Sequence, residues 1–72
     1  MSSPIRLLDV VALTEDVPER RLVRGQVGTV VEELSPGVFE VEFADNSGRT
    51  YALAPLASDR LIVLHYETAA SA

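Results

Sequence analysis

The stretch Val-Phe-Glu-Val-Glu-Phe alternates apolar and acidic side chains with a period of two. Successive side chains of a β-strand point to opposite faces, so this alternation predicts a strand with one buried and one solvated face. The three apolar residues Phe39, Val41 and Phe43 are predicted to face the core. The carboxylates of Glu40 and Glu42 are predicted to face solvent. Such half-buried strands are typical of antiparallel sheets.

Turn signals flank this strand on both sides. Before it, Pro36 and Gly37 occupy the two central positions of a predicted type II turn, in which the glycine takes a positive φ. After it, residues 46–48 predict a three-residue hairpin loop with Gly48 in the left-handed conformation. The chain is therefore expected to form two consecutive hairpins.

The second hairpin has a predicted register. A three-residue loop sets Asp45 opposite Arg49 as an oppositely charged pair. The same register pairs residues of like character further along the two strands: Phe43 with Tyr51, Val41 with Leu53, and Ala44 with Thr50.

The first hairpin is less regular. A two-residue turn would set Glu32 against the core-facing Val41, so we expect a bulge or bend near residues 30–31.

The other elements follow from apolar runs and breakers. Strands are predicted at residues 9–13, at 25–34 with a bend or close backbone approach at Gly28, and at 60–66. Residues 54–59 are predicted to be a connector with one 3₁₀ turn. The chain is thus expected to be all-β, a small five-stranded SH3-like barrel with a long first loop. One domain over residues 1–72 is predicted, with an ordered core at about 6–66 and a flexible tail at 67–72.

Chain length and composition narrow the range of possible functions. With 72 residues and no cysteine, the chain has no disulfide and little interior for a catalytic cavity, so we expect no enzyme activity. A net charge of −5 disfavours nucleic acid as a partner. No apolar stretch approaches the length of a membrane span, and Pro4, Arg6 and Asp9 interrupt the region where a signal peptide would be apolar. A cytoplasmic protein is expected.

The acidic residues of the central strands and the single histidine are candidates for binding or metal sites. Glu40 and Glu42, with the neighbouring residues 32–33, form an acidic patch that could bind a cation or a basic protein surface, or simply be a solvated face. His65 is the only histidine, so a histidine metal site or a catalytic triad lacks its other members. No metal and no cofactor are expected.

The only cluster of basic residues is Arg20, Arg21 and Arg24, within the polar loop of residues 14–24. These guanidinium groups could dock an acidic partner through bidentate contacts with carboxylates. The alternative is that they pair with the loop's own Glu15, Asp16 and Glu19. Val17, Leu22 and Val23 are the expected apolar anchors of the loop.

The final predicted strand contains residues 61–64, which are apolar on both faces. Its second face should therefore be covered. The cover could be Ile5, Leu7 and Leu8 from the N-terminal segment, or another chain in an oligomer.

The chain resembles a family of short bacterial proteins known as domain of unknown function 4926. The resemblance rests on Gly-Gln-Val-Gly-Thr-Val-Val at residues 25–31, Phe-Glu-Val-Glu-Phe at 39–43 and Gly-Arg-Thr-Tyr-Ala-Leu at 48–53, and covers about residues 8–64. It implies a fold and no activity. A looser similarity to SH3-like ribosomal and elongation modules implies binding of RNA or protein.

The sequence favours a non-enzymatic protein-interaction module that binds a partner protein or itself. Arg20, Arg21 and Arg24 with a strand edge are its expected contacts, and Glu40 and Glu42 are further candidates. A nucleic-acid-binding module and an accessory subunit of an enzyme complex are the alternatives.

Overall fold

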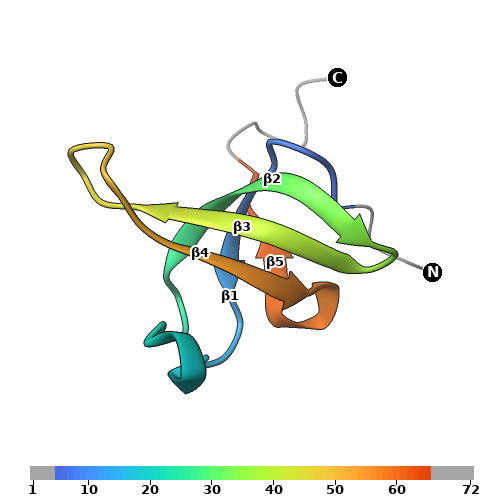
Figure 1. Cartoon of the computed structure of the whole chain (residues 1–72), viewed down its shortest axis with the longest axis horizontal. Helices are drawn as coiled ribbons and strands as arrows, with labels where there is room; N and C mark the ends of the chain where they lie inside the picture. Colours follow the sequence, from blue (N-terminus) through green and yellow to red (C-terminus); the bar gives the residue numbers. More distant parts are fainter. Residues whose placement is uncertain (1–4, 66–72) are drawn as a thin grey trace.

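The computed structural model describes residues 5–65, which form five strands and two 3₁₀ turns (Figure 1). In chain order the elements are β1 (Val10–Leu13), η1 (Pro18–Arg20), β2 (Val27–Ser35), β3 (Val38–Ala44), β4 (Thr50–Ala57), η2 (Ser58–Arg60) and β5 (Leu61–Val63). The all-β prediction is confirmed, as is the 3₁₀ turn before the last strand. The turn η1 within the long loop was not predicted. Tyr66 and the predicted tail at 67–72 lie outside the described residues.

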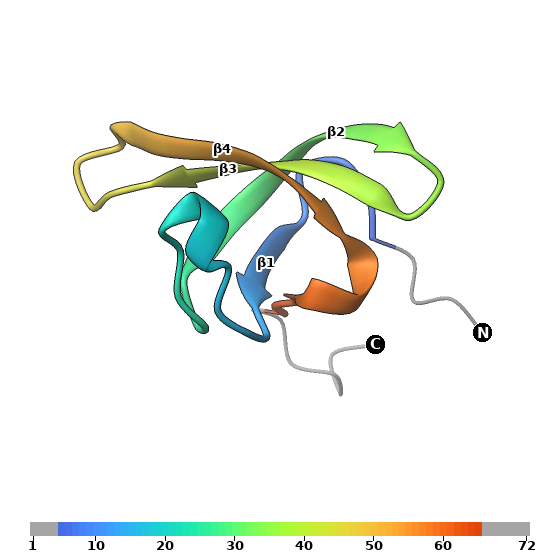
Figure 2. The same cartoon turned by 60° about the horizontal axis from the view of Figure 1, so that its bottom comes forward.

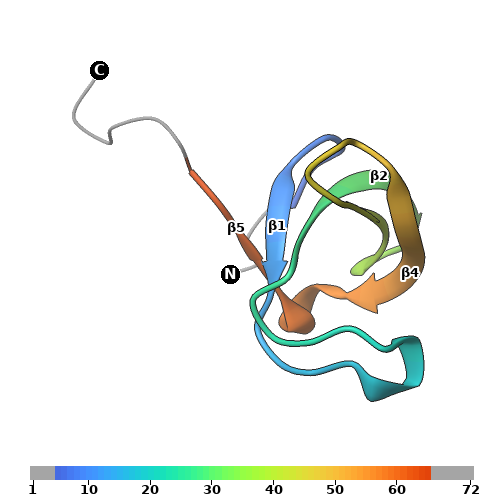
Figure 3. The same ribbon diagram turned by 90° about the vertical axis from the view of Figure 1, so that its left-hand side faces the viewer.

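All five strands belong to one antiparallel sheet with the order β4-β3-β2-β1-β5. Figure 3 shows this sheet end-on, strongly curled so that one face becomes an interior. Within residues 5–65, β4 and β5 do not pair with each other, so they form the two edges of an open sheet.

The interior of the curl holds the core. Phe39, Val41 and Phe43 are at most 5% exposed, which confirms the core-facing side of the alternating strand. The other buried apolar side chains come from the remaining four strands and from the first loop: Val11, Leu13, Val17, Leu22, Val30, Ala54, Leu56 and Leu61.

The β2–β3 hairpin turns at Pro36 and Gly37, where Gly37 has a φ of +79°, the value that the predicted turn requires. The predicted bulge is present, because the register shifts between Val30 and Glu32. A second shift, between Glu33 and Ser35, was not predicted. Extra residues in one strand increase its bend and twist, and Figure 2 shows β2 curving strongly along its length.

The β3–β4 hairpin has the predicted loop. Gly48 has a φ of +85°, and its N–H donates to the carbonyl of Asp45 at 2.9 Å. Asp45 and Arg49 pair through their backbones, but the expected ion pair between their side chains is not among those of the described residues. The Asp45 carboxylate instead accepts hydrogen bonds from the N–H groups of Ser47 and Arg49.

The predicted register of this hairpin is correct for Ala44 opposite Thr50 and wrong beyond it. A bulge next to Ala44 shifts the pairing by one residue, so Phe43 lies opposite Ala52 and Val41 opposite Ala54. A one-residue slip moves side chains to the other face of a strand. Tyr51 and Leu53 are consequently about half exposed, at 48% and 51%.

β4 also extends through the region predicted to be a connector, up to Ala57. The predicted connector at 54–59 is wrong for residues 54–57, because Pro55 lies within the strand and does not end it. Proline is tolerated on an edge strand because no second ladder requires its N–H. The last strand is shorter than predicted, since η2 includes Arg60 and β5 ends at Val63.

Gly28 lies on β2 where the neighbouring strand β3 approaches closely. A Cβ at this position would be 2.7 Å from Val41 Cγ1 and 2.8 Å from the carbonyl oxygen of Glu42. The predicted close approach at this glycine is confirmed.

Candidate interaction surface

The segment of residues 14–25 between β1 and β2, here called the arginine loop, is folded against the core. Val17 and Leu22 bridge each other, with hydrogen bonds of 2.9 and 3.1 Å between their backbones. Both side chains are at most 1% exposed. Figure 2 shows η1 and the rest of the loop lying alongside the curled sheet. Two of the three predicted anchors are thus correct, and the third, Val23, is exposed.

Hydrogen bonds also close the base of the arginine loop. Gly25 N–H donates to the carbonyl of Leu13 at 2.8 Å, and Leu13 N–H donates to that of Gln26 at 2.9 Å. The Asp16 carboxylate accepts from the backbone N–H of Arg24 at 2.9 Å. The loop is therefore a defined element joined to β1, β2 and the core.

Arg60 of η2 pairs with both glutamates of the arginine loop. Its Nε lies 2.7 Å from Glu15 Oε2, and its Nη1 lies 3.2 Å from Glu19 Oε2. A hydrogen bond to the backbone at Glu19 and then the Arg60 guanidinium hold the pKa of the Glu19 carboxyl below its ordinary value. These two ion pairs, here called the Arg60 clamp, were not predicted. Arg60 is 45 residues from Glu15 and 41 residues from Glu19, and no local sequence pattern marks such contacts.

The ion pairs of Arg60 bear on the two interpretations of the loop's basic residues. Glu15 and Glu19 are engaged by Arg60, and Asp16 accepts from a backbone group. Within residues 5–65 no ion pair involves the guanidinium groups of Arg20, Arg21 or Arg24. All three residues are exposed, and the charge of Arg20 also contributes to lowering the pKa of the Glu19 carboxyl.

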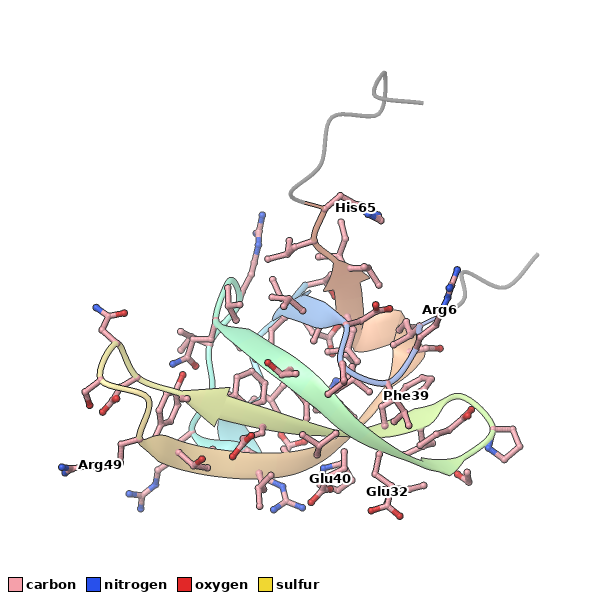
Figure 4. All side chains as sticks on the ribbon, turned by 90° about the horizontal axis from the view of Figure 1, so that it is seen from above. Arg6, Glu32, Phe39, Glu40, Arg49 and His65 are labelled. Atoms are coloured by element: carbon pink, nitrogen blue, oxygen red, sulfur yellow. The ribbon has the colours of Figure 1, made fainter. Side chains whose placement is uncertain are left out.

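The acidic candidates lie on a different element. Glu40 and Glu42 belong to β3, and Glu40 sits directly opposite Glu32 of β2. Figure 4 shows Glu32 and Glu40 projecting from the same side of the sheet. The Glu42 carboxylate accepts a hydrogen bond from the hydroxyl of Thr50. No group of three or more possible metal ligands occurs in the described part of the chain.

The apolar last strand is only partly covered. Ile5 packs against the core, whereas Leu7 and Leu8, named with it as a possible cover for this strand, are 59% and 75% exposed. Ile62 on the outer face of β5 is 54% exposed. An open groove of about 570 Å³ runs beside β5, and sequence reasoning had no means of finding it. It is lined by Ile5, Thr14, Ser58, Leu61, Ile62, Val63 and His65.

One comparison with known proteins decides the family. The family model described as Domain of unknown function (DUF4926) matches residues 7–63, which include every strand. The chain belongs to the DUF4926 family. No curated protein and no solved structure matches this DUF4926 protein. In residues 5–65 of the DUF4926 chain, no helix is long and apolar enough to cross a bilayer.

Proposed function

We propose that this DUF4926 protein is a non-catalytic interaction module with SH3-like architecture, whose arginine loop binds an acidic surface of a partner protein. Five short strands, a long first loop and a 3₁₀ turn directly before the last strand support the comparison with SH3-like modules. The strand order, with β1 between β2 and β5, supports it further. Because one fold serves many functions, the function is argued from the surface.

A single observation carries the proposal: the arginine loop is held by the core while its three guanidinium groups are free of ion pairs with the described residues. Val17 and Leu22 fix the loop from within, and Arg60 engages its glutamates. A loop that is already ordered loses less conformational entropy when it binds. Exposed guanidinium groups form bidentate hydrogen bonds with carboxylates and are enriched at protein interfaces.

The net charge of the whole chain favours one orientation of docking with an acidic partner. With a formal net charge of −5, most of the surface repels an acidic partner, and the arginine loop is the segment with clustered positive charge. Repulsion elsewhere favours one docking orientation over others. The same net charge opposes a polyanion that must contact many sites along its length.

The experiment compares three versions of the full chain as immobilised bait in native lysate. These are the wild type, an Arg20/Arg21/Arg24→Ala variant, and an Arg6/Arg49→Ala variant that removes two exposed arginines lying outside the loop. Captured proteins are identified by mass spectrometry, purified and titrated against each bait. We expect an acidic protein whose affinity falls about tenfold or more only with the loop variant.

Two results would overturn the proposal. One is a captured protein that binds the wild type and the loop variant equally well. The other is retention of nucleic acid that is eluted by moderate salt and lost in the loop variant, which would establish the nucleic-acid alternative instead.

A further inference from the structure

The two edges of the sheet differ in their protection against pairing with another strand. β4 contains Pro55, which has no N–H to donate, and it lies beside the carboxylates of Glu40 and Glu42. Proline and charged side chains are the usual means of blocking an edge. β5 has the sequence Leu-Ile-Val, with no proline and no charged residue. Among the described residues, β5 is therefore the edge that lacks these protections.

The direction of the backbone groups on β5 follows from its hydrogen bonds to β1. Leu64 N–H donates to the carbonyl of Val10 at 2.8 Å, and Thr14 N–H donates to that of Arg60 at 3.0 Å. In an antiparallel pair, alternate residues direct both backbone groups toward the partner strand. The N–H and C=O of Ile62 thus point toward β1, while the N–H and C=O of Val63 point away from the sheet. Figure 3 shows β5 at the outside of the curl, with β1 as its neighbour.

We propose that β5 pairs antiparallel with β5 of a second copy of this chain, across a two-fold axis at Val63, so that two sheets become one. In this arrangement Val63 N–H donates to the Val63 carbonyl of the second copy, and the reverse bond forms by symmetry. Leu61 then lies opposite His65 of the second copy. The N–H of Leu61 already donates to the carbonyl of Ser58. The C=O of Leu61 is left to accept a hydrogen bond from the backbone N–H of His65 of the second copy.

The side chains suit the same symmetric register. On the outer face, Ile62 would lie opposite Leu64 of the second copy, an apolar cross-strand pair. Ile62 already begins a row of apolar neighbours, since it lies opposite Ala12, which lies opposite Val27. Ile62 and Val27 are 54% and 44% exposed, so this row forms an apolar strip on the outer face. Ile62 is the end of the strip that lies at the seam.

Charge does not oppose the pairing locally, despite the net charge of −5. Residues 61–64 carry no charge, and the neighbouring Arg60 is paired with two glutamates. The groove of about 570 Å³ beside β5 leaves room for side chains of an added strand. A second copy is argued from the side chains, because the two-fold register brings Ile62 and Leu64 together twice, once on each side of the axis. This surface is separate from the arginine loop, so the inference does not rest on the proposed function.

The test is sedimentation equilibrium of the purified full chain from about 10 μM to about 1 mM, because a short seam gives a weak dimer. The wild type should approach twice the monomer mass as its concentration rises. Ile62→Lys should remain monomeric, or dimerise at least tenfold more weakly. Its matched control is Leu53→Lys, which alters a side chain of similar exposure, 51%, on the protected edge and should leave dimerisation unchanged.

A second variant tests the hydrogen bonds themselves. Val63→Pro removes the N–H that faces away from β1, so the ladder with β1 is retained while the seam loses both central bonds. Circular dichroism establishes that it folds. If it does not fold, N-methylation of Val63 in the synthetic chain removes the same N–H without changing the side chain. Either form should be monomeric.

The proposal is overturned if the wild type stays monomeric at the highest concentration, or if Leu53→Lys weakens the dimer as much as Ile62→Lys. Persistence of the dimer after loss of the Val63 N–H would also overturn it. A monomeric wild type whose captured partner is lost by Ile62→Lys would assign the edge to a strand of another protein. Because the sedimentation experiment contains no partner, its failure leaves the function of the arginine loop unaffected.

Discussion

Gly28 is the glycine with the least space for a side chain. An added methyl group would contact backbone as well as side-chain atoms, with the Glu42 carbonyl oxygen only 2.8 Å away. Backbone in the middle of a sheet yields little, so Gly28→Ala should lower the free energy of unfolding by about 3 kcal/mol. Urea unfolding followed by circular dichroism measures the change.

Gly48 provides the matched comparison. Nothing lies within 4 Å of a Cβ at this position, but its φ of +85° disfavours any β-branched residue. Gly48→Val should therefore lower stability by about 1 kcal/mol or somewhat more, through backbone strain alone. If Gly28→Ala were as mild as this variant, the close packing of β2 against β3 would be incorrect.

The Asp45 carboxylate should make the β3–β4 hairpin sensitive to acid. Hydrogen bonds from the Ser47 hydroxyl and then from the Arg49 N–H lower the pKa of Asp45 from its ordinary value of 3.8. A carboxyl with a lower pKa in the folded state contributes stability above its unfolded pKa and loses it as the pH falls through the folded pKa. Asp45→Ala should therefore be less stable than the wild type at neutral pH, with the difference narrowing below about pH 3.8.

Urea midpoints of both proteins across this pH range make the measurement. Asp45→Asn, which retains an acceptor oxygen without the charge, should lie between them at neutral pH. A difference that is constant with pH would show that the charged form has no special role at the turn.

At the scale of elements, sequence reasoning succeeded wherever the pattern was local. The alternation in β3, the two glycine turns and the bulge near Val31 were all predictable, because period and turn chemistry act between near neighbours. The register of β4 was not, since a bulge at Ala44 depends on how two strands twist together. The ion pairs of Arg60 with Glu15 and Glu19 were missed for the same reason, because they join residues far apart in the chain.

The arginine loop should behave as part of the core and not as an appendage. Leu22 is 1% exposed and packs with Val17 in the main cluster. Leu22→Ala should lower the free energy of unfolding of the whole domain by about 3 kcal/mol, in one cooperative transition. The neighbouring Val23→Ala, at 56% exposure, should change it by less than about 0.5 kcal/mol. Thermal unfolding monitored by two spectroscopic probes distinguishes a global change from local melting of the loop.

For the molecule as a whole, the excess of acidic residues should make stability depend on salt. Eleven acidic residues face six basic ones, and Glu32 lies directly opposite Glu40. Added salt screens repulsion between exposed charges, so raising sodium chloride from about 10 mM to about 0.3 M should raise the melting temperature by about 3 °C.

A single substitution tests the source of this effect. Glu40→Gln removes the carboxylate pair across β2 and β3 and should stabilise the domain by about 0.5 kcal/mol at low salt, with a smaller gain at high salt. Asp59→Asn serves as the control, because it removes one negative charge from η2. Equal effects of the two variants would assign the salt dependence to net charge alone.

The pairing of β1 with β5 also governs how the protein is made. Val11 lies opposite Val63, so the first strand acquires its second neighbour only when almost the last described residue has been synthesised. A contact between positions so distant in the chain requires the intervening segment to close as a large loop, which slows folding. On the ribosome, β1 to β4 would emerge with the inner side of Val11 and Leu13 incompletely enclosed. Completion of the native sheet therefore waits until β5 is available to pair with β1, and follows the formation of the hairpins.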